Sequence, residues 1–290
     1  MRGVADKRDR AGVTRSLHVP WQPPAALSPY VRAMTAYDLI LDRPGMHRGL
    51  PSTSLTLVLP LEQPLDVAWT RLPHTRSRSW SSVSGLHTAP AEIRHRGRLA
   101  GIQLALTPAG ARALFGVPAA ELAGVLTELG PVAAPLADLP DRLPEAATWR
   151  ERLALVEARL LEFAARAPHA DPRPEVGWAL RRLSLAPTVG SVADEVGLSR
   201  RHLGSLFHAE YGVTPKQYQR IARFNASSRE LSRQVRRGRT SLAHLAATCG
   251  FADQAHLTRE WTALAGCSPT TWLREEFPFL QDDTVSPALA

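Results

Sequence analysis

The chain repeats itself near its C-terminal end, and this repeat constrains the fold more than any other feature. His202-Leu203 recurs 54 positions later as His256-Leu257, and Gly212 recurs at the same offset as Gly266. A self-similar unit of this length is a repeated supersecondary element. The turn and cap residues inside each copy predict a helix-turn-helix pair.

Each copy has a polar residue that can cap a first helix, a glycine that can end it and a polar residue that can cap a second helix. These residues are Ser191, Gly197 and Ser199 in the first copy, and Ser241, Gly250 and Asp253 in the second. Each second helix places apolar residues on one face and mostly short polar residues on the other. The apolar residues are Leu203, Leu206 and Phe207 in one helix, and Leu257, Trp261 and Leu264 in the other. Such a helix is what a DNA major groove can accept.

A long helix is expected between the two copies. Thr214-Pro215-Lys216-Gln217 is a strong helix start, because a threonine cap, a proline in the first turn and a glutamine at the box position coincide. The helix is expected to run to about Gln234, roughly 20 residues or ~30 Å at 1.5 Å per residue. That length is close to one turn of DNA, ~34 Å, so one rod can hold two reading helices in successive major grooves. Lys216, Arg220 and Arg223 form a basic stripe along it, which makes them candidate phosphate contacts.

Positive charge is concentrated in the same region. The chain of 290 residues has a formal net charge of +8, and ten basic residues but only two acidic ones lie between Arg200 and Arg239. A focused excess of this kind is what a polyanion-binding surface requires. The two cysteines, Cys249 and Cys267, are too few for a disulfide framework, so a reduced cytosol is the default location. No apolar run approaches the ~20 residues of a membrane span.

The N-terminal part reads as a separate α+β domain that is strand-rich and barrel-like. Strands are expected at 36–41, 54–59 and 101–106, and helices at 111–115, 119–129 and 148–165. A proline-rich segment then separates this part from the helical region. The predicted organisation is a disordered leader at 1–17, a sensor or dimerisation domain at 18–166, a linker at 167–174, an all-α DNA-binding domain of seven helices at 175–277 and a flexible tail at 278–290.

Residues 175–276 resemble the DNA-binding domain of AraC/XylS-family transcription regulators. The resemblance depends on the Leu-Ser-Arg-Arg-His-Leu-x-x-Leu-Phe run that ends at Phe207, on the Gly-Val-Thr-Pro run that ends at Pro215, and on the Gly-Phe-x-Asp-Gln-x-His-Leu-x-Arg run that ends at Arg259. The N-terminal part resembles, more loosely, a sensor region of one subgroup of these regulators, through residues 51–61 and 106–111.

The resemblance implies which residues read bases. The matching positions are Arg201, Gly204 and Ser205 on the first reading helix, and Gln254, Ala255, Thr258 and Arg259 on the second. Four further candidates for phosphate contact stand at the starts of the two helices: Ser199, Arg200, Asp253 and His256.

Several roles stay open on sequence alone. Gly204 implies either an unusually close approach of backbone to DNA or a first helix that reads little. Arg259 can form two hydrogen bonds to a guanine, but it can also contact a phosphate. Gln254 fits an adenine contact or a contact to the DNA backbone only. His202 and His256 suit structural or phosphate-positioning roles.

The N-terminal part offers weaker signals. Tyr30, Tyr37, Trp69 and Trp80 are candidates to line an effector cavity, although aromatic residues in strands are usually core. Its histidines lack the spacing of a metal site, and no catalytic motif or cofactor motif is present.

The function that these observations predict is a cytoplasmic, sequence-specific transcription regulator that binds double-stranded DNA and is not an enzyme. No metal, cofactor, catalytic residue or membrane association is expected. RNA polymerase and an unidentified small-molecule effector are further candidate partners, and the chain is expected to act as a monomer or a homodimer. The alternative is an enzyme or DNA-repair protein tethered to DNA by the C-terminal module.

Overall fold

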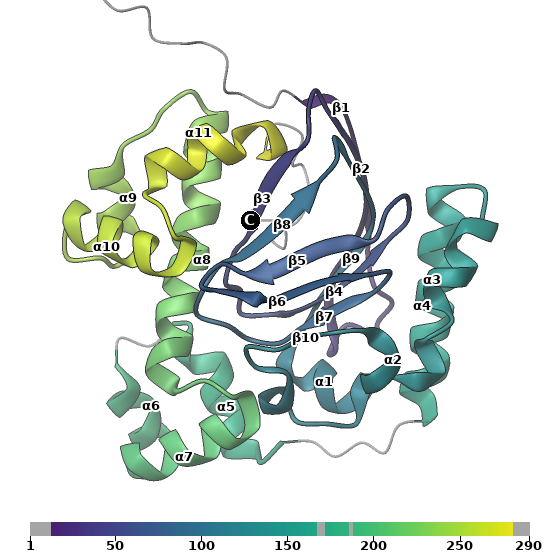
Figure 1. Ribbon diagram of the computed structural model, residues 1–290. Coiled ribbons are helices and arrows are strands. Elements are labelled where there is room, and N and C mark those ends of the chain that lie inside the picture. The colour runs from purple at the N-terminus through teal and green to yellow at the C-terminus, as the bar shows by residue number, and fades with distance from the viewer. Residues whose placement is uncertain (1–12, 167–171, 186–187, 281–290) are drawn as a thin grey trace, which may run out of the picture.

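The computed structural model describes residues 13–166, 172–185 and 188–280. Strands dominate the first part of the chain and helices the last part, and Figure 1 shows the helical part beside the strands. The expected linker falls mostly on residues 167–171 and the expected tail mostly on 281–290, which lie outside the described residues, as do residues 1–12 of the expected leader.

The N-terminal strands form two antiparallel sheets that face each other. The larger sheet has the order β1 (Val13–Trp21), β2 (Val31–Leu41), β9 (Arg98–Leu106), β4 (Leu55–Pro60), β7 (Ser82–Ser84) and β10 (Leu126–Thr127). The smaller sheet has the order β3 (Gly45–Gly49), β8 (Ala91–His95), β5 (Leu65–Trp69) and β6 (Leu72–Ser79). The strand-rich prediction is confirmed, and the three strands expected from apolar runs are the central strands β2, β4 and β9. The described strands do not close into a barrel.

Two local expectations are wrong. Residues 13–17, assigned to a disordered leader, begin β1, because this segment pairs antiparallel with β2 from Val13 opposite Leu41 to Trp21 opposite Met34. The helix expected over 119–129 is instead a short 3₁₀ turn, η1 (Ala119–Leu122), followed by β10. Gly124 adopts a left-handed φ of 69°, and the next residues pair with β7 instead of continuing a helix.

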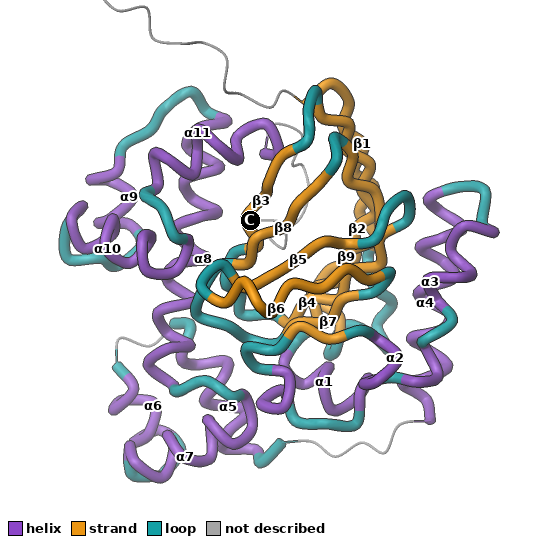
Figure 2. The backbone as a smooth tube through the Cα atoms, in the orientation of Figure 1, coloured by secondary structure: helices purple, strands orange, loops and turns teal. Residues whose placement is uncertain are grey.

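Helical segments that follow β9 pack against the larger sheet. They are α1 (Pro108–Phe115), α2 (Leu129–Val132), η2 (Ala134–Leu136), α3 (Leu139–Arg142), η3 (Leu143–Glu145) and α4 (Trp149–Arg166). The amphipathic helix expected at 148–165 is α4, and Leu153, Val156 and Leu160 are buried on its inner face. Figure 2 shows the strands between α3–α4 on one side and α8–α11 on the other.

The described residues of the C-terminal domain form seven helices, as expected. They are α5 (Pro174–Leu183), α6 (Val189–Glu195), α7 (Arg200–Tyr211), α8 (Pro215–Arg236), α9 (Leu242–Thr248), α10 (Gln254–Ala265) and α11 (Pro269–Leu280). Its apolar core is continuous with the N-terminal domain. One cluster of buried side chains extends from the sheets to Phe207 and Tyr218, and Leu50 of the N-terminal domain belongs to the cluster around Trp261 and Trp272. The two domains are therefore packed together by buried apolar surface.

Candidate DNA-binding surface and ligand cavity

The two helix-turn-helix units have nearly the same backbone. In the first, Ser199 accepts a hydrogen bond from the His202 amide and begins α7. In the second, Asp253 accepts one from the His256 amide and begins α10. Gly212 and Gly266, which end the two helices, have φ angles of 71° and 72°. The repeat in the sequence is thus a repeat in three dimensions.

The first helix of each unit begins with a residue whose side chain caps it. Ser241 accepts from the His244 amide at the start of α9, as expected. The cap of α6 is Thr188 rather than Ser191, so that expectation is wrong. Ser191 lies one turn inside the helix, where its amide donates to the Thr188 hydroxyl oxygen and its own hydroxyl donates to the Thr188 carbonyl.

The helix α8 holds the two units apart. Thr214 and Gln217 form the expected capping box, and the helix continues two residues beyond the expected end, to Arg236. Its 22 residues correspond to ~33 Å. Tyr218, Ile221 and Phe224 form its buried side. In Figure 1, α6–α7 lie at one end of this rod and α9–α10 at the other.

The candidate base-reading residues lie on the solvent side of the two reading helices. Exposed members are Arg201, Ser205, Gln254, Ala255 and Arg259, and the half-buried ones are Gly204 and Thr258. Each helix also has the same internal bond, in which Ser205 donates to the Arg201 carbonyl and Thr258 to the Gln254 carbonyl. On the opposite faces Leu203, Phe207, Leu257, Trp261 and Leu264 are buried, and Leu206 is half-buried. Each unit therefore presents a polar face supported by a packed core.

The candidate phosphate contacts divide into exposed residues and residues held by protein partners. Ser199, Arg200, Lys216 and Asp253 are exposed. Arg220 instead forms a bidentate ion pair with Glu260, at 2.8 and 3.1 Å, which ties α8 to α10.

Two candidates are engaged with Phe251. The Arg223 guanidinium lies 5.7 Å from the centre of the Phe251 ring, and the His256 ring packs edge-on to the same phenyl group. His256 Nδ1 also accepts a hydrogen bond from the Ala252 amide. These contacts give His256 a structural role in the turn, and its phosphate contact stays a prediction.

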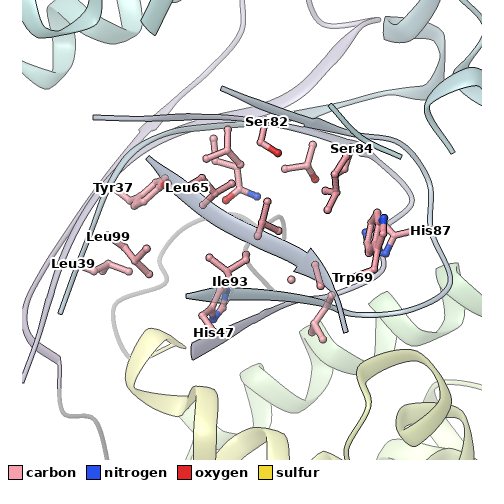
Figure 3. Close-up of a pocket in the computed structure, with 18 residues that line it drawn as sticks. Tyr37, Leu39, His47, Leu65, Trp69, Ser82, Ser84, His87, Ile93 and Leu99 are labelled. Carbon is pink, nitrogen blue, oxygen red and sulfur yellow. The ribbon is translucent and has the colours of Figure 1, made fainter. Parts of the chain in front are cut away.

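A cavity of about 100 Å³ lies between the two sheets of the N-terminal domain. Figure 3 shows side chains from both sheets pointing into it, with Tyr37 toward one end and Trp69 and His87 at the other. Of the four aromatic residues proposed from the sequence, Tyr37 and Trp69 line the cavity, whereas Trp80 is an exposed side chain. His47, His87 and Gln103 also line the cavity, and no local sequence pattern pointed to them.

Trp69 and His87 separate this cavity from a second one. The second cavity measures about 240 Å³ and lies between the domains, since Gly212, Val213 and Gln217 of the C-terminal domain line it. The His87 ring is tilted against the Trp69 ring, with 4.6 Å between their centres. Burial lowers the pKa of His87 to about 4, although its bond to the Ala89 carbonyl acts in the opposite direction.

The N-terminal domain holds the C-terminal domain through polar contacts on three helices. Arg112 forms a bidentate ion pair with Glu210 of α7, with both distances 2.7 Å. Asn225 of α8 donates to the Pro51 carbonyl and accepts from the Thr53 amide. These partners are about a hundred or more residues apart in the chain, so no local sequence pattern points to them.

The third contact begins in the cavity wall. His47 Nδ1 lies 2.5 Å from Glu276 Oε2 of α11, and both side chains are buried. The Arg48 amide donates to the other oxygen of Glu276. A residue that lines the cavity is thus bonded directly to the last helix of the C-terminal domain.

Comparison with known families agrees with this geometry. Residues 192–275, from α6 to α11, match the family model of a helix-turn-helix domain. The C-terminal domain is an AraC-type helix-turn-helix domain. Residues 20–128 match a second model, described as a domain of unknown function (DUF6597). No curated protein matches the chain.

Several solved structures are similar to this chain over most of its length. An apo form of a ToxT variant from Vibrio cholerae is 9% identical, with a TM-score of 0.50 over 85% of this chain and 97% of that one. Unsaturated fatty acid bound wild-type ToxT is 10% identical, with a TM-score of 0.48 over 96% and 99% of the two chains. The AraC-like transcriptional activator CuxR is 15% identical, with a TM-score of 0.30 over 78% and 97%. Of these three, the first alone reaches 0.5, and it supports a common fold.

Two features are absent from the described residues. Over 13–166, 172–185 and 188–280, no three His, Cys, Asp or Glu side chains are grouped so that they could hold a metal ion. In the same ranges no helix combines the length and the apolar character needed to cross a membrane.

Proposed function

We propose that this protein is a sequence-specific transcription regulator of the cytoplasm, that it acts on double-stranded DNA as a monomer or homodimer, and that it is not an enzyme. The observation that carries the proposal is the pair of equivalent helix-turn-helix units at the two ends of α8, each with an exposed polar face. Contact with RNA polymerase is a further part of this proposal.

Phosphate contacts and base contacts have different tasks in this proposal. Arg200 and Lys216 set register and affinity by neutralising phosphates, which makes binding fall with salt. Arg259 and Gln254 select sequence from the second reading helix, since arginine and glutamine can each form two hydrogen bonds to one base. The first reading helix adds less to this selection, through Arg201 and Ser205.

Selection of bound sequences from a random pool of duplexes tests this function. We expect one enriched site, bound at least a thousandfold more tightly than random DNA at physiological salt. Affinity for both should fall steeply between 50 and 200 mM salt. Recovery of no common sequence would contradict sequence-specific regulation.

We further propose that the cavity between the sheets holds a small-molecule effector. Two parts of its wall reach the DNA-binding domain: His47 is bonded to Glu276, and Trp69 with His87 faces the turn between α7 and α8. An effector that changes either contact shifts the position of the reading helices, provided that it binds the two arrangements unequally. DNA affinity measured with and without a cavity ligand is the test, and equal affinities would contradict an effector role.

A further inference from the structure

We propose that the cavity between the sheets takes a small, uncharged and mainly apolar molecule that carries a hydrogen-bond donor and is no larger than a single aromatic ring. This inference rests on the proposed effector role and names the chemical class of the effector. It follows from the charge, the hydrogen-bonding atoms and the size of the cavity.

No lysine, arginine, aspartate or glutamate is among the described residues that line the cavity. The alternation of side chains along each strand explains this. In β5, Leu65, Val67 and Trp69 point inward, whereas Asp66 points outward and pairs with Arg76. In β8, Ala91 and Ile93 point inward, and Glu92 pairs with the same arginine. The carboxylates of β5 and β8 are therefore paired with arginines away from the cavity.

A charged ligand would have to lose its hydration inside this wall without gaining a counter-charge. Burial of an unpaired ion costs several kcal/mol, so the cavity selects against carboxylates and ammonium ions. His47 does not change this conclusion, because its Nδ1 is already bonded to the buried carboxylate of Glu276.

The wall does offer neutral hydrogen-bonding groups. The Ala89 carbonyl can only accept, so His87 Nδ1 is the donor of their 2.7 Å bond, and Nε2 is left as an acceptor. In the described part of the chain nothing donates to this Nε2. The low pKa of His87 and the burial-raised pKa of Tyr37 keep both side chains uncharged at neutral pH. The ligand therefore needs a donor that can reach His87.

Size limits the ligand further. The cavity volume is about 100 Å³, whereas an apolar cavity of ~150 Å³ is enough for benzene. The cavity is smaller than the one that holds benzene, so it excludes a long acyl chain and makes a single ring the upper size limit of the ligand. The tilted pair of Trp69 and His87 provides aromatic surface at one end, against which a ring can pack.

Four single-ring probes test the proposal on the full-length protein: phenol, toluene, benzoate and benzylammonium. We expect calorimetry to show the tightest binding for phenol, roughly fivefold weaker binding for toluene, which lacks the donor, and at least tenfold weaker binding for the two ions. The inference is overturned if an ion binds as well as phenol, or if none of the four binds.

Two variants connect the binding to this cavity. His87→Phe keeps a ring beside Trp69 but removes Nε2, so phenol should bind about fivefold more weakly and toluene equally well. Val67→Phe fills the cavity and should abolish binding of both, while Met46→Phe, an exposed substitution in the same sheet, should leave binding unchanged. If toluene and phenol each bind equally well to the wild type and to all three variants, the site lies elsewhere and the inference is overturned.

The effect on DNA separates this inference from the proposed effector role. Phenol that binds without altering DNA affinity would support the ligand class and contradict the effector role. A change in DNA affinity caused by benzoate, through the same cavity, would support the effector role and overturn the ligand class.

Discussion

At the residue scale, exposure and partners separate side chains that are available to DNA from those already engaged. Arg259 and Lys216 are exposed, on α10 and α8 respectively. Arg220 belongs to the same basic stripe as Lys216, but its guanidinium is paired with Glu260. The stripe therefore combines an exposed charge at Lys216 with an internal ion pair at Arg220, which spacing alone does not reveal.

Arg259→Ala and Lys216→Ala should have different effects on DNA binding. Loss of the arginine removes a base contact worth ~1–3 kcal/mol and should reduce the preference for the selected site over random DNA. Loss of the lysine should weaken binding to both equally and lower the salt slope by about one unit. Titrations of both duplexes at several salt concentrations check this. Equal losses on both duplexes for Arg259→Ala would assign the arginine to phosphate.

Gly204→Ala decides between the two interpretations of the first reading helix. A Cβ at this position meets nothing within 4 Å in the protein, so the substitution should stabilise α7 by about 0.5–1 kcal/mol. We expect unchanged affinity for the selected site, because the first helix is expected to read little. A tenfold loss of affinity with raised stability would show instead that the backbone approaches DNA closely there.

The His87 ring should make stability depend on pH. Its pKa is lowered from 6.5 to about 4 in the folded protein, so the unfolded chain binds the proton more readily and stability falls as pH drops from 6.5 toward 4. A shift of this size corresponds to roughly 3 kcal/mol, and we expect about half of it because the ring is only half-buried. Denaturant unfolding of the wild type and of His87→Phe checks this, since the variant should lack that part of the decline.

At the element scale, the rod α8 is the component on which the spacing of the reading helices depends. The Thr214–Gln217 capping box satisfies amides of its first turn, directly after the first unit ends at Gly212. At its other end the rod packs against the second unit, where Phe224 contacts Trp261 at 4.9 Å between ring centres. The rod is thus anchored in both units.

Thr214→Ala should loosen the start of α8. Loss of the cap costs about 1 kcal/mol, which corresponds to roughly fivefold faster hydrogen exchange of the amides in the first turn. Thr214→Ser keeps the hydroxyl and is the matched control, for which exchange should stay close to that of the wild type. Equal acceleration in both variants would mean that the capping hydroxyl does not stabilise this turn.

At the scale of the whole molecule, the N-terminal domain is the scaffold on which both reading units rest. Arg112 holds the first unit, His47 and Arg48 hold the last helix, and Leu50 is inserted in the core of the second unit. This arrangement means that the separation of the units depends on the N-terminal domain as well as on α8.

The double substitution Arg112→Ala with Glu276→Ala should undock the domains in part. Each change leaves a buried polar partner unsatisfied, at a cost of about 1–3 kcal/mol. We expect a larger radius of gyration in small-angle X-ray scattering. Glu195→Ala is the control, because its ion pair with Arg182 is exposed and lies inside the DNA-binding domain. A double variant as compact as this control would show that apolar packing alone holds the domains.

Local signals in the sequence determined the DNA-binding domain. Caps, turn glycines and apolar spacing act within a few residues, so they predicted both helix-turn-helix units, the rod α8 and its buried face. The exposed faces of α7 and α10 follow from the same spacing. The base contacts assigned to them stay predictions. The strands β2, β4 and β9 were also evident, because buried strands are apolar runs.

Only the tertiary structure decided the rest. The cap at Thr188, the strand β1 and the short strand β10 depend on which partner a segment meets. His47 of the cavity wall is bonded to Glu276, although the two residues are more than two hundred positions apart in the chain. Such contacts form because two folded surfaces bury apolar area together, and the energy of that burial depends on shape in three dimensions rather than on the order of residues in the chain.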